Sequence, residues 1–475
     1  MTHHDLAIIG ATIVDGTGSA RFAANVYVTG DAIAAVSPPG RVGSATEIVE
    51  AKGLILAPGF IDVHTHDDMA LIHTPELRSK TSQGVTTVIT GLCGYSAAPL
   101  PHGVDLPQEY DILIPEGGQT FPRFGQYLDA VASAAPAPNW LPLVGHSSLR
   151  IASMTRLDRP ASQQEQAEMA RAFEAALDDG AAGLSSGLAY SMAKAASTDE
   201  LVDLCRVMAP RRLPYVTHVR DEGDRLVEAV EEALQVGRSA GVTVILSHHK
   251  ALGGRNHGKV EQTLGIVDSA CRCQSVGLDV YPYAYSSTSL TPERAARGGE
   301  IIITRSVAMP EAVGRTLESV AAELECDQIE AARRLQPAGA LYFLMDEDDV
   351  RRVLRHPLTM IGSDGLPFDG QPHPRLWGTF PRVLGRYVRD SGILTLEAAI
   401  HKMTGLSASM FGLDRRGLIR PGHFADLVLF DPAEIVDQAS PSDPTARSEG
   451  IRDVWVNGRR TSRGTGRRLS SQHNG

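Results

Sequence analysis

The sequence predicts an α/β protein built around a (β/α)8 TIM barrel, with a small β-sandwich domain formed from both ends of the chain. Two observations carry this prediction. Short apolar runs that end in polar residues recur eight times through the middle of the chain, and several are followed by segments with helical periodicity. Strand-like runs separated by turn residues occupy the two ends, and the 475 residues leave room for both units.

The two ends alternate apolar runs with turn residues, which is the pattern of short strands. Three such runs lie within residues 5–60, and two more lie within residues 417–460. We expect these runs to pair into one β-domain made of residues 1–58 plus 412–475.

The eight apolar runs of the middle segment are the expected barrel strands. Segments 163–180 and 224–241 carry helix-period apolar residues and end in glycine, as the helix of a βα repeat should. We expect the barrel over 59–411. The stretch 286–346 is too long for an ordinary connection and is expected to form an insertion over the barrel mouth. The runs are GFIDVHTH (59–66), VTTVITGLCG (85–94), WLPLVGHSSLR (140–150), GAAGLSSGL (180–188), LPYVTHVR (213–220), VTVILSHHK (242–250), GLDVYPY (277–283) and TMIGSDG (359–365).

The composition is that of an ordinary globular protein, with 43% hydrophobic and 21% charged residues. The formal net charge of −11 argues against the basic surface of a nucleic-acid-binding protein. Five scattered cysteines argue against a disulfide framework. The sequence has no export signal and no long apolar span, so we expect a cytoplasmic protein with neither a membrane nor an obligate protein partner.

Metal-competent side chains follow the ends of the predicted strands. Barrel active sites are built at the carboxyl ends of the strands, so residues far apart in the sequence would converge there. His64 and His66 would point the same way, because side chains alternate with a period of two along a strand. Histidine nitrogens together with a cysteine thiolate favour zinc over magnesium or calcium. The six candidates are His64, His66, Cys93, His218, His248 and Asp364.

Each candidate has a plainer interpretation when it is taken alone. The two histidines could be satisfied in a polar turn, Cys93 could be a small buried apolar residue, and Asp364 could be a turn residue or a helix N-cap. His248 is followed by His249, and only one of the two can face inward. Six such residues, each at a strand end, argue against coincidence.

The segments that carry these residues resemble the amidohydrolase superfamily: GFIDVHTHDD, TSQGVTTVITGLCG, THVRDEG, ILSHHKA and IGSDG. The cysteine of GLCG and the lysine of SHHK are similar to its N-acyl-D-amino-acid deacylase branch. The resemblance covers most of the chain, including ADLVLFDP near its end. It implies zinc-dependent hydrolysis of the amide bond of a small N-acyl-D-amino acid, giving a free D-amino acid and a carboxylate.

The resemblance also divides the six candidates between two metal positions, and whether the second is filled stays open. Many superfamily members bridge two metals with a carboxylated lysine after the fourth strand, but this region has no lysine before Lys194. The departure fits the deacylase branch, in which Cys93 would bridge two metals or serve one. The implied ligands are Cys93, His218 and His248 for a tightly bound zinc, and His64, His66 and Asp364 for the weaker position.

A catalytic role for Asp364 follows from the chemistry of such a centre. Zinc lowers the pKa of its bound water to about 7, so the nucleophile is water rather than a side chain. A neighbouring carboxylate can accept the proton of this water and return it to the leaving amine. We expect Asp364 to be this general base and acid.

Substrate recognition requires cationic and polar groups despite the acidic total charge. Arg294 resembles the position that meets an acidic side chain in glutamate-specific members, which favours N-acyl-D-glutamate as the substrate. Tyr283 is an alternative to Tyr281, because the two would share a strand face, and the choice among Ser286, Ser287 and Ser289 is open. The substrate-binding residues that the resemblance implies are Lys250, Tyr281, Ser287, Arg294 and Arg375, to which we add Tyr190 after GLSSG.

Two other functions remain as alternatives. Ser185 in GLSSG satisfies the G-x-S-x-G pattern of serine hydrolases, with Asp364 and His401 following in the order serine, acid, histidine. This alternative leaves His64, Cys93 and His218 unexplained. The second alternative is a zinc-binding barrel without catalysis, but structural zinc sites are usually closed by four Cys or His ligands.

Overall fold

The computed structural model describes residues 3–40, 43–114 and 118–472, and within them eight segments of parallel strand form a closed barrel. Two sheets share this barrel, one with the order β6-β7-β8 and the other with the order β17-β13-β12-β11-β10-β9. Only Leu143 separates β8 from β9, and Val63 N–H donates to Ile361 O (3.5 Å) between β6 and β17. The strands are β6 (Phe60–Asp62), β7 (Val85–Thr90), β8 (Asn139–Pro142), β9 (Val144–Gly145), β10 (Leu184–Gly187), β11 (Tyr215–His218), β12 (Val244–Leu246), β13 (Val276–Val280) and β17 (Thr359–Ile361).

Each of the eight predicted runs contains one of these barrel strands, which confirms the fold class. The run 140–150 differs in detail, because its strand ends at Gly145 and the following HSSLR begins helix α4. Apolar side chains from the strands form one buried cluster, as the filled interior of a small barrel requires. This cluster includes Ile61, Ile89, Leu141, Val216, Ile245 and Met360.

The helices between the strands begin and end at the residues that the sequence marks. Helix α5 begins with a capping box of Ser162 and Glu165 and ends at Gly180, whose φ of 115° favours glycine. Helix α7 likewise ends at Gly241. The helices are α1 (Ala70–His73), α2 (Arg78–Thr81), α3 (Phe124–Ala134), α4 (His146–Ser153), α5 (Gln163–Asp179), α6 (Thr198–Met208), α7 (Leu226–Ala240), α8 (Lys259–Ala270), α9 (Pro292–Ala295), α10 (Leu317–Glu323), α11 (Gln328–Arg334), α12 (Glu347–Arg355), α13 (Arg375–Arg382), α14 (Leu396–Met403) and α15 (Gly405–Met410).

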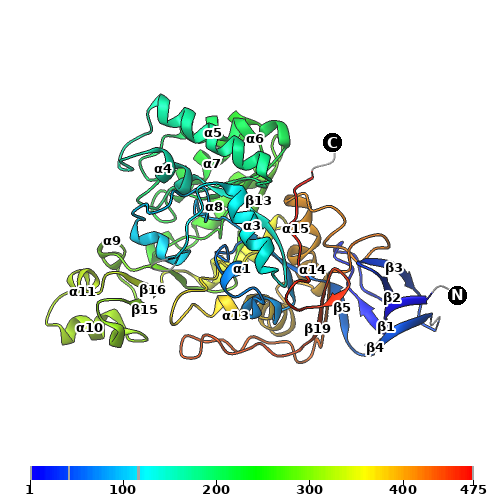
Figure 1. Cartoon of the computed structure of the whole chain (residues 1–475). Helices are drawn as coiled ribbons and strands as arrows, with labels where there is room; N and C mark the ends of the chain where they lie inside the picture. Colours follow the sequence, from blue (N-terminus) through cyan, green and yellow to red (C-terminus); the bar gives the residue numbers. More distant parts are fainter. Residues whose placement is uncertain (1–2, 41–42, 115–117, 473–475) are drawn as a thin grey trace.

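Strands from both ends of the chain form one sheet beside the barrel (Figure 1). The order is β20-β19-β18-β5-β1-β2-β3, with β4 also paired to β1. The two ends meet where β18 pairs antiparallel with β5. The strands are β1 (His3–Ile13), β2 (Phe22–Thr29), β3 (Ala32–Ser37), β4 (Ser44–Glu50), β5 (Ile55–Pro58), β18 (Leu427–Phe430), β19 (Ile451–Val456) and β20 (Arg459–Arg460).

Residues from β14 to β16 form a small unit at the opposite end of the molecule from this sheet (Figure 1). Its antiparallel sheet has the order β14-β16-β15, and it has its own apolar cluster with α10 and α11. Residues from β14 to Arg297 line the main cavity, so this unit contributes to the site. Its strands are β14 (Ser286–Ser289), β15 (Ile301–Ser306) and β16 (Ala338–Tyr342).

Candidate metal centre and its cavity

The six metal-competent side chains converge at the carboxyl end of the barrel, and all are buried. Each lies at the end of a strand or in the loop that follows it: two after β6 and one each after β7, at the end of β11, after β12 and after β17. Their ligand atoms form two groups in which every atom lies within 4.8 Å of the others, and Cys93 belongs to both. The groups are His64, His66, Cys93 and Asp364, and Cys93, His218 and His248.

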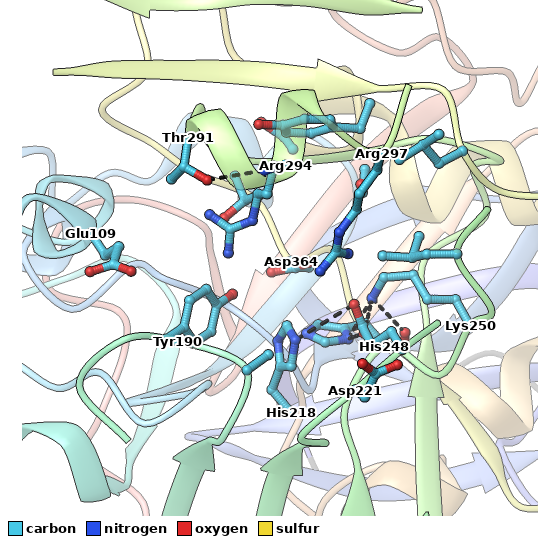
Figure 2. Close-up of a pocket in the computed structure, with 18 of the residues that line it drawn as sticks. Glu109, Tyr190, His218, Asp221, His248, Lys250, Thr291, Arg294, Arg297 and Asp364 are labelled. Atoms are coloured by element: carbon cyan, nitrogen blue, oxygen red, sulfur yellow. Dashed lines mark hydrogen bonds and ion pairs between the residues drawn. The ribbon is translucent and has the colours of Figure 1, made fainter. Parts of the chain in front are cut away.

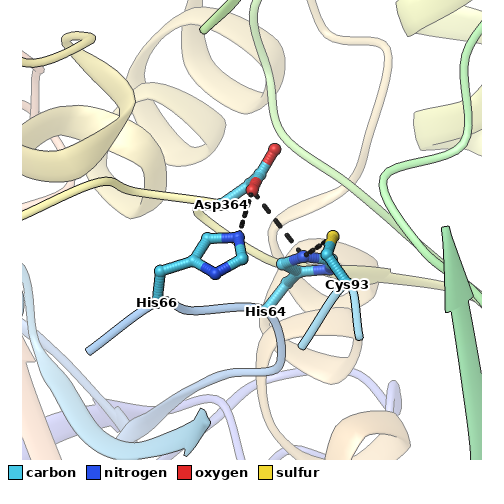
Figure 3. Close-up of side chains that lie close together, drawn as sticks. All are labelled: His64, His66, Cys93 and Asp364. Carbon is cyan, nitrogen blue, oxygen red and sulfur yellow. Dashed lines mark hydrogen bonds and ion pairs between the residues drawn. The ribbon is translucent and has the colours of Figure 1, made fainter. Parts of the chain in front are cut away.

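The first group joins the two strands that close the barrel, together with the cysteine after β7 (Figure 3). His64 Nε2 lies 3.2 Å from Cys93 Sγ and 3.7 Å from Asp364 Oδ1. His66 Nε2 lies 3.2 Å from the same carboxylate oxygen. The expectation that the two histidines face one way is met, since both reach Asp364.

The second group brings together residues from β7, β11 and β12. Cys93 Sγ lies 3.7 Å from His218 Nδ1 and 3.3 Å from His248 Nε2. His249 points elsewhere, with Nε2 lying 2.7 Å from Thr263 Oγ1. Of the two adjacent histidines, His248 is therefore the one that faces the centre.

The geometry of these groups fits a divalent zinc. Two ligands bound at about 2.0–2.3 Å in a tetrahedral arrangement lie roughly 3.3–3.7 Å apart, and these nitrogen, sulfur and oxygen atoms lie 3.2–3.7 Å apart. Cys93, His248 and Asp364 also have positive φ values of 52°, 34° and 50°, a conformation that is uncommon for residues other than glycine. Backbone strain of this kind clusters at functional sites.

Neighbouring charges set the ionisation of the candidate ligands. Burial raises the pKa of the Cys93 thiol, but the charge of His64 and other neighbouring histidines lowers that pKa to well below its ordinary value. Burial also raises the pKa of Asp364, and the Arg375 guanidinium holds it well below its usual range. Burial lowers the pKa of His218 and favours the neutral ring. Burial lowers the pKa of His64, His66 and His248, but the neighbouring thiolate and carboxylates raise it above its ordinary value. A thiolate, a carboxylate and a neutral imidazole are the forms that bind metals, so a bound cation would displace the protons of these three rings.

Asp279 on β13 orients two of the histidines and was not among the predicted site residues. Its Oδ2 lies 3.2 Å from His64 Nδ1, and its Oδ1 accepts a hydrogen bond from His248 N–H at 2.9 Å. Carboxylates that hold the second nitrogen of a metal-binding histidine are common. The signal in the sequence was an aspartate inside an otherwise apolar strand run.

Glu222 has a similar role on the other side of the centre and was also missed. Its Oε1 accepts a hydrogen bond from Lys250 Nζ at 2.6 Å and lies 3.2 Å from His248 Nδ1. Its Oε2 lies 3.5 Å from His218 Nε2. A carboxylate four residues after a strand-end histidine was the available signal.

The serine-hydrolase alternative lacks the required geometry. Ser185 is buried in β10, donates to Gly91 O at 2.5 Å and accepts from Gly94 N–H. His401 lies on α14, where Nδ1 contacts Gly16 O at 2.8 Å. The described residues therefore do not assemble a triad from these two side chains and Asp364.

A cavity of about 420 Å³ opens above the centre (Figure 2). Part of its wall is Tyr190, whose ring centroid lies 4.8 Å from that of His218. Arg294 and Arg297 extend into the cavity from the side opposite His218 and His248 (Figure 2). The predicted substrate-binding residues that line it are Lys250, Tyr281, Ser287, Arg294 and Tyr190.

The sequence left two tyrosines and three serines as candidates for substrate binding, and only some of them line the cavity. Tyr281 lines the cavity, whereas the hydroxyl of Tyr283 contacts Pro374 O at 3.5 Å. Both tyrosines follow the end of β13 at Val280, so the alternation of a strand does not decide which of them reaches the cavity. Ser286 and Ser287 line the cavity.

Arg375 lies behind the cavity wall. Its side chain is 1% exposed, Nη1 lies 2.8 Å from Asp364 Oδ2, and Nη2 donates to Ser287 O at 3.2 Å. In this arrangement the guanidinium faces the candidate general base rather than the open cavity. A direct contact between Arg375 and a substrate stays a prediction.

No helix within the described part of the chain is long and apolar enough to span a membrane.

Comparison with known proteins identifies relatives over nearly the whole chain. From Alcaligenes xylosoxydans xylosoxydans, a D-aminoacylase is 47% identical over 96% of this chain and 93% of its own length. An N-acyl-D-aspartate deacylase of the same organism is 48% identical, over 96% of this chain and 91% of its own. An N-acyl-D-glutamate deacylase of that organism is 46% identical, over 96% of this chain and 93% of its own.

Solved structures agree with these sequence relationships. A crystal structure of D-aminoacylase has 46% identity and a TM-score of 0.96, covering 98% of this chain and 100% of its own. A structure of N-acyl-D-glutamate deacylase from Bordetella bronchiseptica, complexed with zinc and a phosphonate mimic of the tetrahedral intermediate, has 44% identity and a TM-score of 0.96, covering 99% and 100%. The model of the amidohydrolase family matches residues 47–461. This chain therefore belongs to the amidohydrolase family.

Proposed function

We propose that this protein is a zinc-dependent hydrolase of N-acyl-D-amino acids, with a preference for substrates whose side chain is acidic. One observation carries the proposal. Two groups of ligand-type side chains share Cys93 at the floor of a cavity whose walls hold Lys250, Arg294 and Arg297. The relatives whose names refer to D-amino acids support the stereochemistry, and the Bordetella bronchiseptica structure complexed with zinc supports the metal.

The residues of the centre have distinct tasks in this proposal. Bound zinc would supply a water of lowered pKa and would polarise the amide carbonyl. Asp364 accepts the proton of the attacking water as the bond between oxygen and the carbonyl carbon forms. Asp364 then returns the proton to nitrogen as the carbon–nitrogen bond breaks, so that a neutral amine leaves. His66, at 3.2 Å, and Arg375, at 2.8 Å, keep this carboxylate oriented.

The α-carboxylate of the substrate requires cationic and hydroxyl partners near the centre. Lys250 is buried, lines the cavity and is held in place by Glu222 at 2.6 Å. Ser287 Oγ is buried at the cavity wall with no hydrogen-bond partner among the described residues. Tyr281 also lines the cavity, and the centroid of its ring lies 5.4 Å from Lys250 Nζ and 4.5 Å from Arg375 Cζ. A substrate carboxylate at this wall would lie near the positive charge of Lys250 and would give the Ser287 hydroxyl a hydrogen-bond partner.

The preference for an acidic side chain rests on the two arginines that reach down from α9 and the turn after it (Figure 2). Arg294 donates to Ser289 O at 3.1 Å and lies over the Tyr190 ring, with 5.6 Å from Cζ to the ring centroid. No carboxylate within the described ranges forms an ion pair with Arg294 or Arg297. Sequence identity does not choose among substrates, since the aspartate- and glutamate-specific relatives and the D-aminoacylase match equally well.

A panel of N-acetyl-D- and N-acetyl-L-amino acids tests the proposal. The panel includes glutamate, aspartate, methionine and leucine, and each is assayed with metal-depleted and zinc-restored protein. We expect amine release only from D-isomers, only with zinc, and with the highest kcat/KM for the acidic substrates.

The outcomes separate the parts of the proposal. Activity confined to L-isomers would overturn the stereochemical assignment but leave the metal chemistry in place. A higher kcat/KM for D-methionine than for D-glutamate would overturn the role of the two arginines. Full activity in metal-depleted protein would overturn the mechanism.

A further inference from the structure

A buried lysine lies beneath the metal centre. Lys80 is on the short helix α2, and its side chain is fully shielded from solvent. Its Nζ lies 2.8 Å from Asp62 Oδ2, 3.5 Å from Asp67 Oδ2 and 2.5 Å from Ser363 Oγ. These three partners are themselves buried, so two buried carboxylates share one ammonium.

The partners of Lys80 belong to the two segments that carry three candidate ligands. Asp67 follows His66 directly, and Ser363 precedes Asp364 directly. The oxygens of Asp67 have no hydrogen-bond partner in the part of the chain that the structure describes, so Lys80 is their compensating charge there.

Asp62 joins the same two segments through the backbone. Its Oδ1 accepts from Ser363 N–H at 2.8 Å and from His64 N–H at 3.4 Å. The backbone N–H of Asp364 in turn donates to His64 O at 2.8 Å. The cluster around Lys80 therefore holds the segment after β6 against the segment after β17, where the barrel closes next to the metal centre.

We propose that Lys80 is a positioning residue for the half of the centre formed by His64, His66 and Asp364. Its single ammonium holds Asp62, Asp67 and Ser363 together and thereby sets the spacing between the HxH segment and the Asp364 loop. Lys80 does not contact the half formed by Cys93, His218 and His248. This inference rests on the proposed function, because it requires that the two groups bind metal.

The chain offers a matched control in Lys402. This side chain is also a buried ammonium next to a barrel strand, and it donates to His356 O and to Thr359 O (3.2 Å) near the start of β17, away from the centre. Removal of either ammonium leaves polar groups buried without their partner. Only the loss of Lys80 should act selectively on one metal position.

The experiment measures metal binding rather than turnover. Zinc is titrated into metal-depleted wild type, Lys80→Met and Lys402→Met against chelators of graded affinity, and thermal unfolding records the fold of each variant. For Lys80→Met we expect the affinity for the second zinc equivalent to fall at least tenfold, while the affinity for the first changes less than threefold. Lys80→Arg should lie between Lys80→Met and wild type, and Lys402→Met should bind both equivalents as wild type does.

Each outcome decides between the positioning role and a general role in stability. The inference is overturned if folded Lys80→Met binds both zinc equivalents with wild-type affinity. It is also overturned if the affinity for both equivalents falls equally. If Lys80→Met does not fold, a fall of at least threefold in Lys80→Arg that is confined to the second equivalent supports the role, and any other result overturns it. A wild type that binds only one zinc equivalent overturns the inference, because the position that Lys80 is proposed to set is then not a zinc site. A wild type that binds no zinc overturns the proposed function itself, which the substrate panel tests separately.

Discussion

The guanidinium of Arg375 lies 2.8 Å from the carboxylate of Asp364, measured from Nη1 to Oδ2, and both side chains are buried. A buried pair of this kind defines the charge and the orientation of each member, and removal of one member leaves the other uncompensated. Because Asp364 also contacts His64 and His66, the pair joins helix α13 to the metal centre. Asp364 is therefore held ionised and aimed at the place where the proposed proton transfer occurs.

Replacement of Asp364 by asparagine removes the proposed general base and keeps the size of the side chain. We expect kcat on the best substrate of the panel to fall by about 10²–10⁴-fold, the usual contribution of a positioned base or acid. Elemental analysis should still find zinc in the variant, because Cys93, His218 and His248 are unchanged. A wild-type rate in Asp364→Asn would rule out this role.

Metal removal distinguishes the zinc mechanism from the serine-hydrolase alternative. Dialysis against a strong chelator should abolish activity, and zinc should restore it, because the nucleophile is a water activated by the metal. The Ser185→Ala variant loses the hydroxyl that donates to Gly91 O, and its kcat should stay within about tenfold of the wild-type value. Inactivation by serine-directed reagents, together with insensitivity to chelators, is the opposite pattern and would favour the alternative.

Arg294→Leu tests the recognition of an acidic side chain. Loss of a hydrogen bond to a charged group costs about 1.5–3 kcal/mol, which corresponds to roughly 10–150-fold in kcat/KM. We expect a fall of this size for N-acetyl-D-glutamate and a change of less than about threefold for N-acetyl-D-methionine, measured by steady-state kinetics. Equal losses on both substrates would mean that Arg294 supports the cavity wall rather than the specificity.

Alanine substitutions at two glycines with similar φ values distinguish the cost of backbone strain from the cost of steric overlap. At Gly91, with φ of 76°, an added Cβ would lie 2.1 Å from Leu143 O, whereas at Gly241, with φ of 72°, it would meet nothing within 4 Å. Gly241→Ala should cost about 1–2 kcal/mol of unfolding free energy from its left-handed backbone alone. Gly91→Ala should cost more, because β7 and the β8–β9 junction must also move apart. Equal denaturant midpoints for the two variants would contradict this.

Asp369 makes a pH-dependent contribution to stability. Burial raises the pKa of this carboxyl to about 6, although Arg305 opposes the shift. Between about pH 4 and pH 6 the folded state then binds more protons than the unfolded state, so the free energy of unfolding falls as the pH rises. Relative to Asp369→Asn, the wild type should lose up to about 3 kcal/mol across this window. Urea unfolding of both proteins between pH 4 and pH 7 measures the difference, and parallel curves would refute it.

The barrel and the six candidate ligands could be predicted because their signals are local. A strand of alternating or apolar residues followed by a histidine, cysteine or aspartate is visible in ten residues, and the barrel fold brings such ends to one rim. Asp279, Glu222 and Lys80 were missed because their roles depend on tertiary contacts. Asp279 and Glu222 contact histidines of the centre, and Lys80 contacts residues next to His66 and Asp364. Tyr281 and Tyr283 were left unresolved because the end of β13 at Val280 decides which of them reaches the cavity.

The order of the elements and the residue types available to the centre can be read from the chain alone, because the periodicity of apolar residues and the chemistry of side chains are local properties. Tertiary structure alone decided which side chains meet. Closure of the barrel brings Asp364 against His64 and His66 across some 300 positions of sequence and places Arg375 behind it. Contacts of this kind depend on the packing of the whole barrel, and no local pattern in the chain encodes them.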